Sequence, residues 1–167
     1  MLKANHRLET PIKTELSITL PFDLRQKSRL RAKLDQSDSE VSIILDRGHV
    51  LRHGDCLQTE SGEVISIHAA DESLSVVTSS SLQSLARLAY HLGNRHVPLQ
   101  VGDGWVRYQH DHVLDDMVRQ LGFLVTFVMA PFEPEAGAYA AGHGHSQETS
   151  SEHHQNMHQH DHHHEHA

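Results

Sequence analysis

The last 25 residues of the chain, 143–167, carry ten of its 18 histidines. The imidazole side chain is a common metal ligand, and it is neutral over much of the physiological pH range. The segment has no Lys or Arg, and Met157 is its only aliphatic side chain larger than Ala, so it has little apolar surface around which to fold. We therefore expect a disordered segment that binds divalent metal ions through His143, His145, His153, His154, His158, His160, His162, His163, His164 and His166.

An expression tag is the alternative explanation of this segment. A tag is usually an uninterrupted run of histidines at the very end of a chain, whereas Gln, Asp, Glu and Met break the run here. The broken pattern favours a metal-binding tract that belongs to the protein.

Three of the eight histidines outside this segment stand where they could bind metal. His96 follows the predicted end of a helix in the sequence Gly-Asn-Arg-His96, a place near the surface. His110 and His112 flank Asp111, and because residues two apart in an extended segment point the same way, this pair could chelate one ion. A transition metal usually takes at least four ligands, so the pair needs water, a second chain or the tail. An ordinary solvated side chain is the alternative for each of the three.

The sequence offers little for other kinds of chemistry. A single cysteine, Cys56, allows neither an internal disulfide nor a Cys-based zinc site within one chain, and we expect it to fill an apolar strand position. No His-Glu-x-x-His pattern occurs, and Asp115 and Asp116 fall on a predicted helix, where solvated side chains are expected. No Gly-x-x-x-x-Gly-Lys-Ser/Thr loop is present to hold nucleotide phosphates. The pattern favours a binding protein over an enzyme.

Length and charge narrow the class further. The 167 residues suffice for one ordinary domain or two small ones. The net charge is −8, but half of the imbalance lies from Gly137 onward, which leaves 18 acidic and 14 basic residues in the rest; a nucleic-acid binder would show a basic excess. No apolar run approaches a membrane span, and the first ten residues lack a signal-peptide core. We expect a cytoplasmic protein with neither a membrane nor a nucleic-acid partner.

Residues 1–72 have the pattern of a small β-rich domain. Residues 16–20 alternate apolar and polar side chains, and from 25 to 33 the bases fall on odd positions, which predicts one strand with a charged face and a core face. A turn at 35–39 and a returning strand at 41–45 follow. Glycine-containing turns then mark further short strands, and the polar stretch 70–73 is the expected joint to a second domain.

Residues 73–132 change to a mixed pattern. Strands are expected at 74–78, 97–101, 105–109 and 123–130, with one helix capped from the stretch Ser79-Ser80-Ser81 and another capped by Asp111. The predicted apolar stripes of the two helices are Leu82, Leu85, Ala86, Ala89 and Leu92, and Leu114, Met117, Val118 and Leu121. The order βαββαβ predicts an α+β protein whose second domain is ferredoxin-like, a fold that says little about function. Residues 133–167 lose the apolar pattern and form the expected tail.

Two stretches of the second domain strongly resemble the E-type urease accessory proteins, a family of nickel metallochaperones. They are Leu-Ala-Tyr-His-Leu-Gly-Asn-Arg-His96-Val-Pro-Leu-Gln-Val and His110-Asp-His112-Val-Leu-Asp-Asp-Met-Val-Arg-Gln-Leu-Gly. Two N-terminal stretches match as well, Phe22-Asp-Leu-Arg-Gln-Lys-Ser-Arg29 and Arg47-Gly-His-Val-Leu-Arg-His-Gly-Asp55. The resemblance covers residues 8–132.

The resemblance implies a peptide-binding-like N-terminal domain, a metal-binding C-terminal domain and Ni(II) as cargo for urease apoprotein. It implies that His96 binds nickel at a symmetric homodimer interface and that His110 and His112 occupy a secondary metal site. Individual tail histidines have no counterpart to be carried over. From the resemblance we also expect a complex with an accessory GTPase, which would supply the nucleotide chemistry for which this sequence has no phosphate-binding loop.

Metal storage or detoxification through the tail is the rival hypothesis, with the folded body as a solubility domain. The ligand types do not separate the metals, because copper ranks above nickel and zinc lies close to it. Zn(II) and Cu(II) are therefore possible competitors, and the expectation of nickel comes from the resemblance alone.

Overall fold

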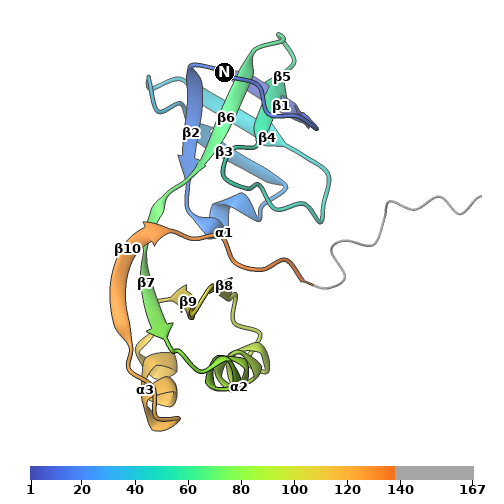
Figure 1. Cartoon of the computed structure of the whole chain (residues 1–167). Helices are drawn as coiled ribbons and strands as arrows, with labels where there is room; N and C mark the ends of the chain where they lie inside the picture. Colours follow the sequence, from blue (N-terminus) through green and yellow to red (C-terminus); the bar gives the residue numbers. More distant parts are fainter. Residues whose placement is uncertain (138–167) are drawn as a thin grey trace, which may run out of the picture.

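The computed structural model describes residues 1–137, which form two β-sheets and three helices (Figure 1). All ten tail histidines lie outside the described residues. The elements of the N-terminal part are β1 (Leu2–Arg7), β2 (Leu16–Leu20), α1 (Phe22–Arg25), β3 (Arg29–Lys33), β4 (Glu40–Ile44), β5 (Cys56–Thr59) and β6 (Val64–Ala69). Those of the C-terminal part are β7 (Asp71–Thr78), α2 (Leu82–Gly93), β8 (Gln100–Gly102), β9 (Trp105–Gln109), α3 (His112–Gln120) and β10 (Thr126–Pro131).

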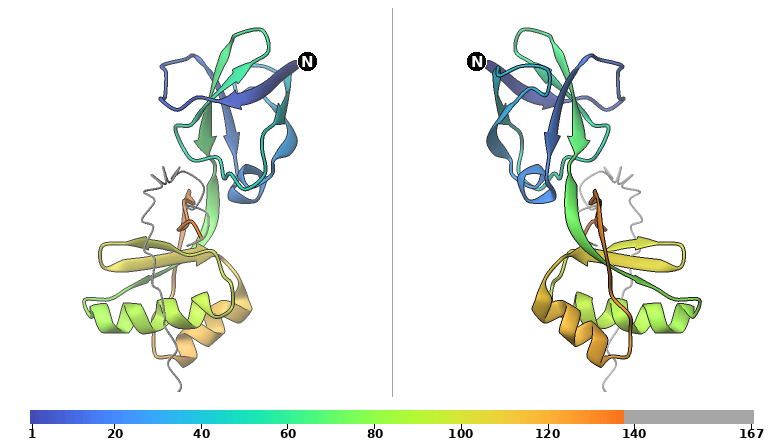
Figure 2. Two further views of the ribbon diagram at one scale, coloured as in Figure 1. Left: turned by 90° about the vertical axis from the view of Figure 1, so that its right-hand side faces the viewer. Right: turned by 90° about the vertical axis from the view of Figure 1, so that its left-hand side faces the viewer.

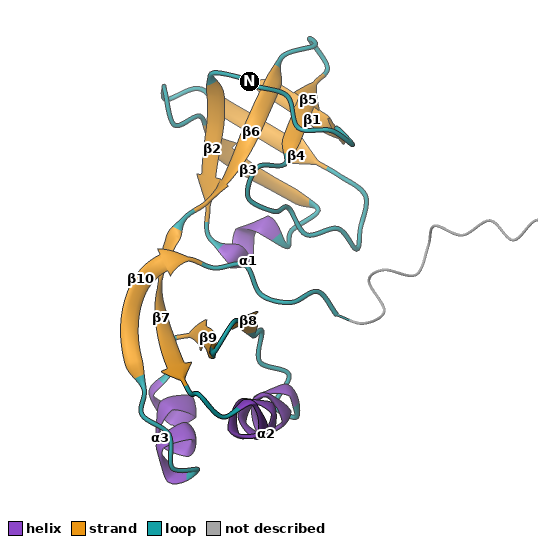
Figure 3. Ribbon diagram, viewed as in Figure 1, coloured by secondary structure: helices purple, strands orange, loops and turns teal. Residues whose placement is uncertain are grey.

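The N-terminal part is one six-stranded sheet in the order β2-β6-β5-β1-β4-β3 (Figure 3). Period-two alternation places one face of each strand inward, as in β6, where Ile65 and Ile67 are fully buried. Ile18, Val41 and Ile43 join them in one apolar cluster. The predicted β-rich first part is therefore present.

The prediction of one strand over residues 25–33 is wrong at its start. The strand begins at Arg29, and Arg25 instead ends the short helix α1, with its side chain fully buried. Arg25 belongs to the alternation of basic and apolar residues, but it lies in the single helical turn that follows Pro21. An alternation over so few residues does not distinguish a strand from one turn of helix. Only Arg29, Arg31 and Lys33 form the basic strand face.

The C-terminal part is a four-stranded antiparallel sheet in the order β10-β7-β9-β8. Figure 2 shows α2 and α3 together on one side of this sheet. Val77, Val106 and Tyr108 of the strands are buried against Leu88 of α2 and Val118 of α3. The α+β class is confirmed.

The caps are predicted correctly, but some core positions and strand lengths are not. The Ser81 side chain accepts a hydrogen bond from the Ser84 amide at the start of α2, as expected. Leu82 is 75% exposed, whereas Leu88, outside the predicted stripe, is buried, because Leu82 stands in the first turn beside the edge of the buried face. The strand expected at 97–101 is shorter and lies later in the chain, at Gln100–Gly102, and the last strand begins at Thr126 and not at 123.

A buried arginine joins the two parts. The Arg25 guanidinium donates hydrogen bonds to the carbonyl oxygens of Leu20 and Leu51 in the N-terminal part, each at 3.1 Å. It also donates to the Phe132 carbonyl oxygen and pairs with the Glu133 carboxylate, both beyond β10. One planar side chain thus contributes donors to backbone from both parts, which suits the fixed fork of a guanidinium.

Apolar contacts surround this ion pair. Phe22, Leu74 and Phe132 form a separate buried cluster, and the two phenyl rings meet edge to face with centroids 5.5 Å apart. The Phe22 amide donates to the Glu72 carboxylate at 3.0 Å. Because Glu72 and Leu74 both lie near the start of β7, the first residues of this strand make the contacts that join the two parts.

Residues just beyond 132, assigned from sequence to the tail, make contacts with both parts. The Glu133 carboxylate accepts hydrogen bonds from the Arg52 guanidinium and the His53 amide, at 3.3 and 3.2 Å. The Glu135 amide donates to the Leu99 carbonyl oxygen at 2.8 Å. These contacts extend the folded body beyond residue 132. Within the described residues, no helix is long and apolar enough to cross a membrane.

We predict that Arg25→Ala lowers the free energy of unfolding by about 3–5 kcal/mol, the cost of removing one partner of a buried ion pair. The loss arises because the hydrogen bonds of the guanidinium to three backbone carbonyl oxygens and its ion pair with Glu133 are all removed. Guanidinium unfolding followed by Trp105 fluorescence measures it. Arg31→Ala, on the exposed face of β3, is the control and should change stability by less than about 0.5 kcal/mol; equal effects of the two substitutions would contradict the role of Arg25.

Candidate metal site

His96 is exposed and stands three residues beyond the end of α2 in a left-handed backbone conformation, with φ of +56°. It is the one residue other than glycine with positive φ in residues 1–137. The His96 amide donates to the Gly93 carbonyl oxygen at 2.9 Å, and the Val97 amide donates to the Leu92 carbonyl oxygen at 3.3 Å. This pair of bonds is a Schellman motif with His96 at the position that glycine usually occupies.

The left-handed conformation costs a residue with a Cβ atom about 1–2 kcal/mol. Here a bulky imidazole stands where glycine would relieve that cost, on the surface and free of buried packing. Packing therefore does not explain why a histidine stands at this position. The backbone turn also fixes the direction in which the imidazole leaves the helix.

His110 follows β9, and its environment is much more constrained. Its amide donates to the Ser73 carbonyl oxygen at 3.0 Å, which continues the β7–β9 ladder by one residue. Its ring meets the Phe127 ring edge to face, with centroids 4.9 Å apart. The Nδ1 atom lies 3.2 Å from the Ser75 hydroxyl oxygen and 3.0 Å from the Asp115 carboxylate, while the side chain remains 40% exposed.

Asp115 is a site residue that sequence reasoning missed. The expectation of a solvated side chain is wrong, because Asp115 is only 1% exposed and accepts a 2.8 Å hydrogen bond from the Tyr108 hydroxyl. Burial, together with this hydrogen bond, raises the pKa of Tyr108 well above its ordinary value, so the phenol stays protonated and donates. The signal was present in the sequence: Asp115 lies three residues before Val118 and so shares the buried face of α3.

His112 begins α3 and is exposed. Asp111 caps this helix, as predicted, by accepting hydrogen bonds from the amides of Val113 and Leu114 at 2.8 and 3.0 Å. The Leu114 and Val113 bonds lower the pKa of the Asp111 carboxyl. The cap therefore fixes the point where β9 turns into α3, with one histidine on each side of it.

The described chain does not gather these histidines into one complete site. Within residues 1–137, no group of three or more His, Cys, Asp or Glu side chains is placed to hold one metal ion. Any ion bound by a single described chain therefore needs ligands from elsewhere.

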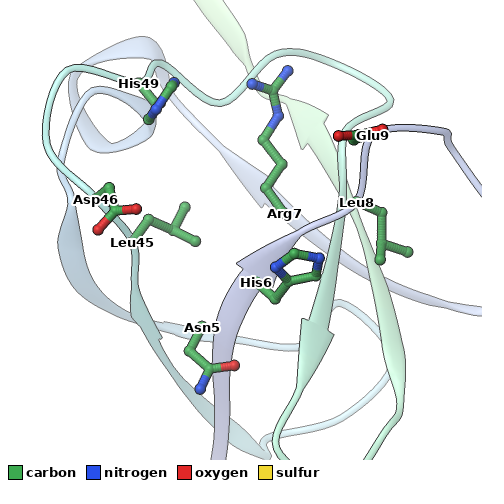
Figure 4. A pocket seen from close by; sticks show the side chains of 8 residues that line it. All are labelled: Asn5, His6, Arg7, Leu8, Glu9, Leu45, Asp46 and His49. Carbon is green, nitrogen blue, oxygen red and sulfur yellow. The ribbon is translucent and has the colours of Figure 1, made fainter.

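An open pocket of about 510 Å³ lies in the N-terminal part, between the end of β1 and the loop after β4. Figure 4 shows His6 on the strand side and Asp46 and His49 on the loop side. These side chains are not among any metal-holding group of three in the described chain. Cys56 is buried in β5, as predicted, with Sγ 3.4 Å from the Ile12 amide nitrogen. The metal-ligand candidates that the sequence indicates in residues 1–137, His96, His110 and His112, all lie in the C-terminal part.

Comparisons with known proteins agree along the whole described chain. The model of the UreE urease accessory protein N-terminal domain matches residues 1–70, and that of the C-terminal domain matches residues 72–166. The urease accessory protein UreE of Alkalilimnicola ehrlichii is 54% identical over 139 residues, which cover 83% of this chain and 85% of that protein. The UreE proteins of Escherichia coli O157:H7 and Citrobacter koseri are 51% and 52% identical and cover 88% and 87% of this chain, and 97% and 96% of their own lengths.

We predict that His96→Gly is more stable than His96→Ala by about 1 kcal/mol, because glycine adopts the left-handed conformation without a steric cost. Thermal unfolding of the two variants measures the difference. Both variants lack the imidazole, so a loss of metal binding that they share comes from the missing side chain, whereas a difference in stability between them comes from the backbone conformation. Equal stability of the two variants would show that the turn carries no strain.

Proposed function

Because this chain belongs to the UreE family of urease accessory proteins, we propose that it is a nickel metallochaperone, which carries Ni(II) as cargo to urease apoprotein. Members of this family act in urease maturation and are not themselves enzymes. The observation that supports the proposal best is His96, an exposed imidazole held beyond α2 in a strained turn. The same motif carries the family resemblance.

A single exposed imidazole is an incomplete ligand set, so the proposal includes a homodimer. A two-fold interface brings a surface patch onto its own copy and would place two His96 side chains on one ion. Tyr90, 66% exposed in the last turns of α2, adds apolar surface to the same helix. A metal ion with few protein ligands and free coordination positions is released more easily than one in a closed site. Delivery requires such release.

His110 and His112 are proposed as the secondary site, on either side of the Asp111 cap. The tail histidines, from His143 to His166, would concentrate nickel for the folded body. Imidazole also binds zinc and copper, so Zn(II) and Cu(II) are expected to compete. We further assign the C-terminal part to the ferredoxin-like arrangement, which the element order βαββαβ and the strand order β10-β7-β9-β8 support.

Delivery requires partners. The proposed complex contains urease apoprotein and its accessory proteins, including the GTPase, which would supply the nucleotide hydrolysis. A cytoplasmic location, with no membrane or nucleic-acid partner, fits the near balance of charge in residues 1–136.

The test is equilibrium nickel binding, with mass in solution, on a chain ending at Gly142. The three buried clusters of the described structure lie within residues 4–132, so the folded body should survive removal of the tail. We expect one tight ion per two chains, and its loss in His96→Gly, which leaves the turn unstrained. His49→Ala, an exposed loop histidine, is the matched control and should bind as the parent does.

Retention of the tight ion in His96→Gly would refute the interface site. Absence of any tight site in the shortened chain would move metal binding to the tail and make storage the better account.

A further inference from the structure

The contact between Asp115 and His110 has a consequence for which nitrogen of His110 can bind metal. Asp115 is almost fully buried, and its Oδ1 atom accepts the Tyr108 hydroxyl. Its Oδ2 atom has no accessible surface to hydrate it and no assigned hydrogen-bond donor in the described chain. The polar atom that faces Oδ2 is Nδ1 of His110, at 3.0 Å.

An ionised carboxylate oxygen only accepts hydrogen bonds. If Nδ1 of His110 carried a lone pair, two acceptors would face each other at 3.0 Å and a buried carboxylate oxygen would stay unsatisfied, which is costly. A proton on Nδ1 removes both problems. The Ser75 hydroxyl oxygen, 3.2 Å from Nδ1, can accept from the same N–H, and the Phe127 ring holds the plane of the imidazole.

We propose that Asp115 is a positioning residue, which holds the His110 proton on Nδ1 and so presents Nε2 to a divalent metal ion. Metal-binding histidines commonly donate their second nitrogen to a carboxylate in this way, and loss of that partner costs 10–100-fold in affinity. Tyr108 fixes the carboxylate in turn, so the chain of contacts runs from the sheet core to the surface. The inference rests on the proposed role of His110 as a nickel ligand, but its proton assignment does not.

The first test reads the proton directly. In the full chain labelled with ¹⁵N-histidine, long-range ¹H–¹⁵N correlations report which ring nitrogen is protonated, and a His110→Gln spectrum identifies the His110 signals. We expect Nδ1–H in the parent. Asp115→Asn keeps an acceptor for Tyr108 but turns an amide donor toward Nδ1, so the proton should move to Nε2. Asp116→Asn, an exposed neighbour paired with Arg119, is the matched control and should leave His110 unchanged.

The second test adds nickel to the same samples, in which the tail histidines buffer the metal equally. We expect paramagnetic loss of the His110 signals in the parent and in Asp116→Asn, and a requirement for at least about ten-fold more free nickel in Asp115→Asn. The proposal is overturned by Nε2–H in the parent, by an unchanged tautomer in Asp115→Asn, or by His110 signals that nickel never affects. Loss of His96 signals with His110 untouched would sink this inference alone, whereas no response at either residue would sink the proposed function.

Discussion

The buried Arg25 guanidinium is the interaction on which the arrangement of the two parts depends. A charge removed from water must be fully hydrogen-bonded, and Arg25 meets this demand only where backbone from both parts converges. Leu20 ends β2 and Leu51 lies in the loop between β4 and β5, whereas Phe132 and Glu133 follow β10, the last strand of the second sheet. Separating the parts would remove the hydrogen bonds of the guanidinium to the Phe132 carbonyl oxygen and the Glu133 carboxylate, and leave a charge with only two acceptors.

Strand β7, which contacts both parts at the joint, also positions residues of the candidate site. β7 packs Leu74 against Phe22 and Phe132 at the joint, and its Ser73 and Ser75 contact His110. The ladder between β7 and β9 brings Tyr108 opposite Ser75, from where its hydroxyl reaches Asp115. The position of the His110 ring is therefore set by sheet register and by a buried carboxylate, whereas that of His96 is set by a backbone turn at a helix end. One fold thus offers one rigidly held imidazole and one strained, exposed imidazole.

The sequence predicted the features that depend on residues close together in the chain, such as the helix caps. The caps Ser81 and Asp111 were predicted because their side chains satisfy amides only two or three residues away. The burial of Arg25 was not predicted, because its partners Phe132 and Glu133 are distant in the sequence. The burial of Asp115 was missed because its charge indicated a solvated residue, although its spacing from Val118 placed it on the buried helix face. The left-handed conformation of His96 was not predicted either, because the residue that usually indicates such a turn is glycine and not histidine. The candidate metal ligands were chosen by residue type, and only the structure shows that no three of them come together within residues 1–137.

The central claim is that His96 passes nickel to urease apoprotein, and nickel transfer tests it most directly. Urease activation would be measured at limiting nickel, with the parent chain ending at Gly142 or with its His96→Gly variant as the nickel source. The account predicts that the parent activates urease and that the variant, whose turn is relaxed and whose fold is intact, does not. Equal activation by the two chains would contradict it.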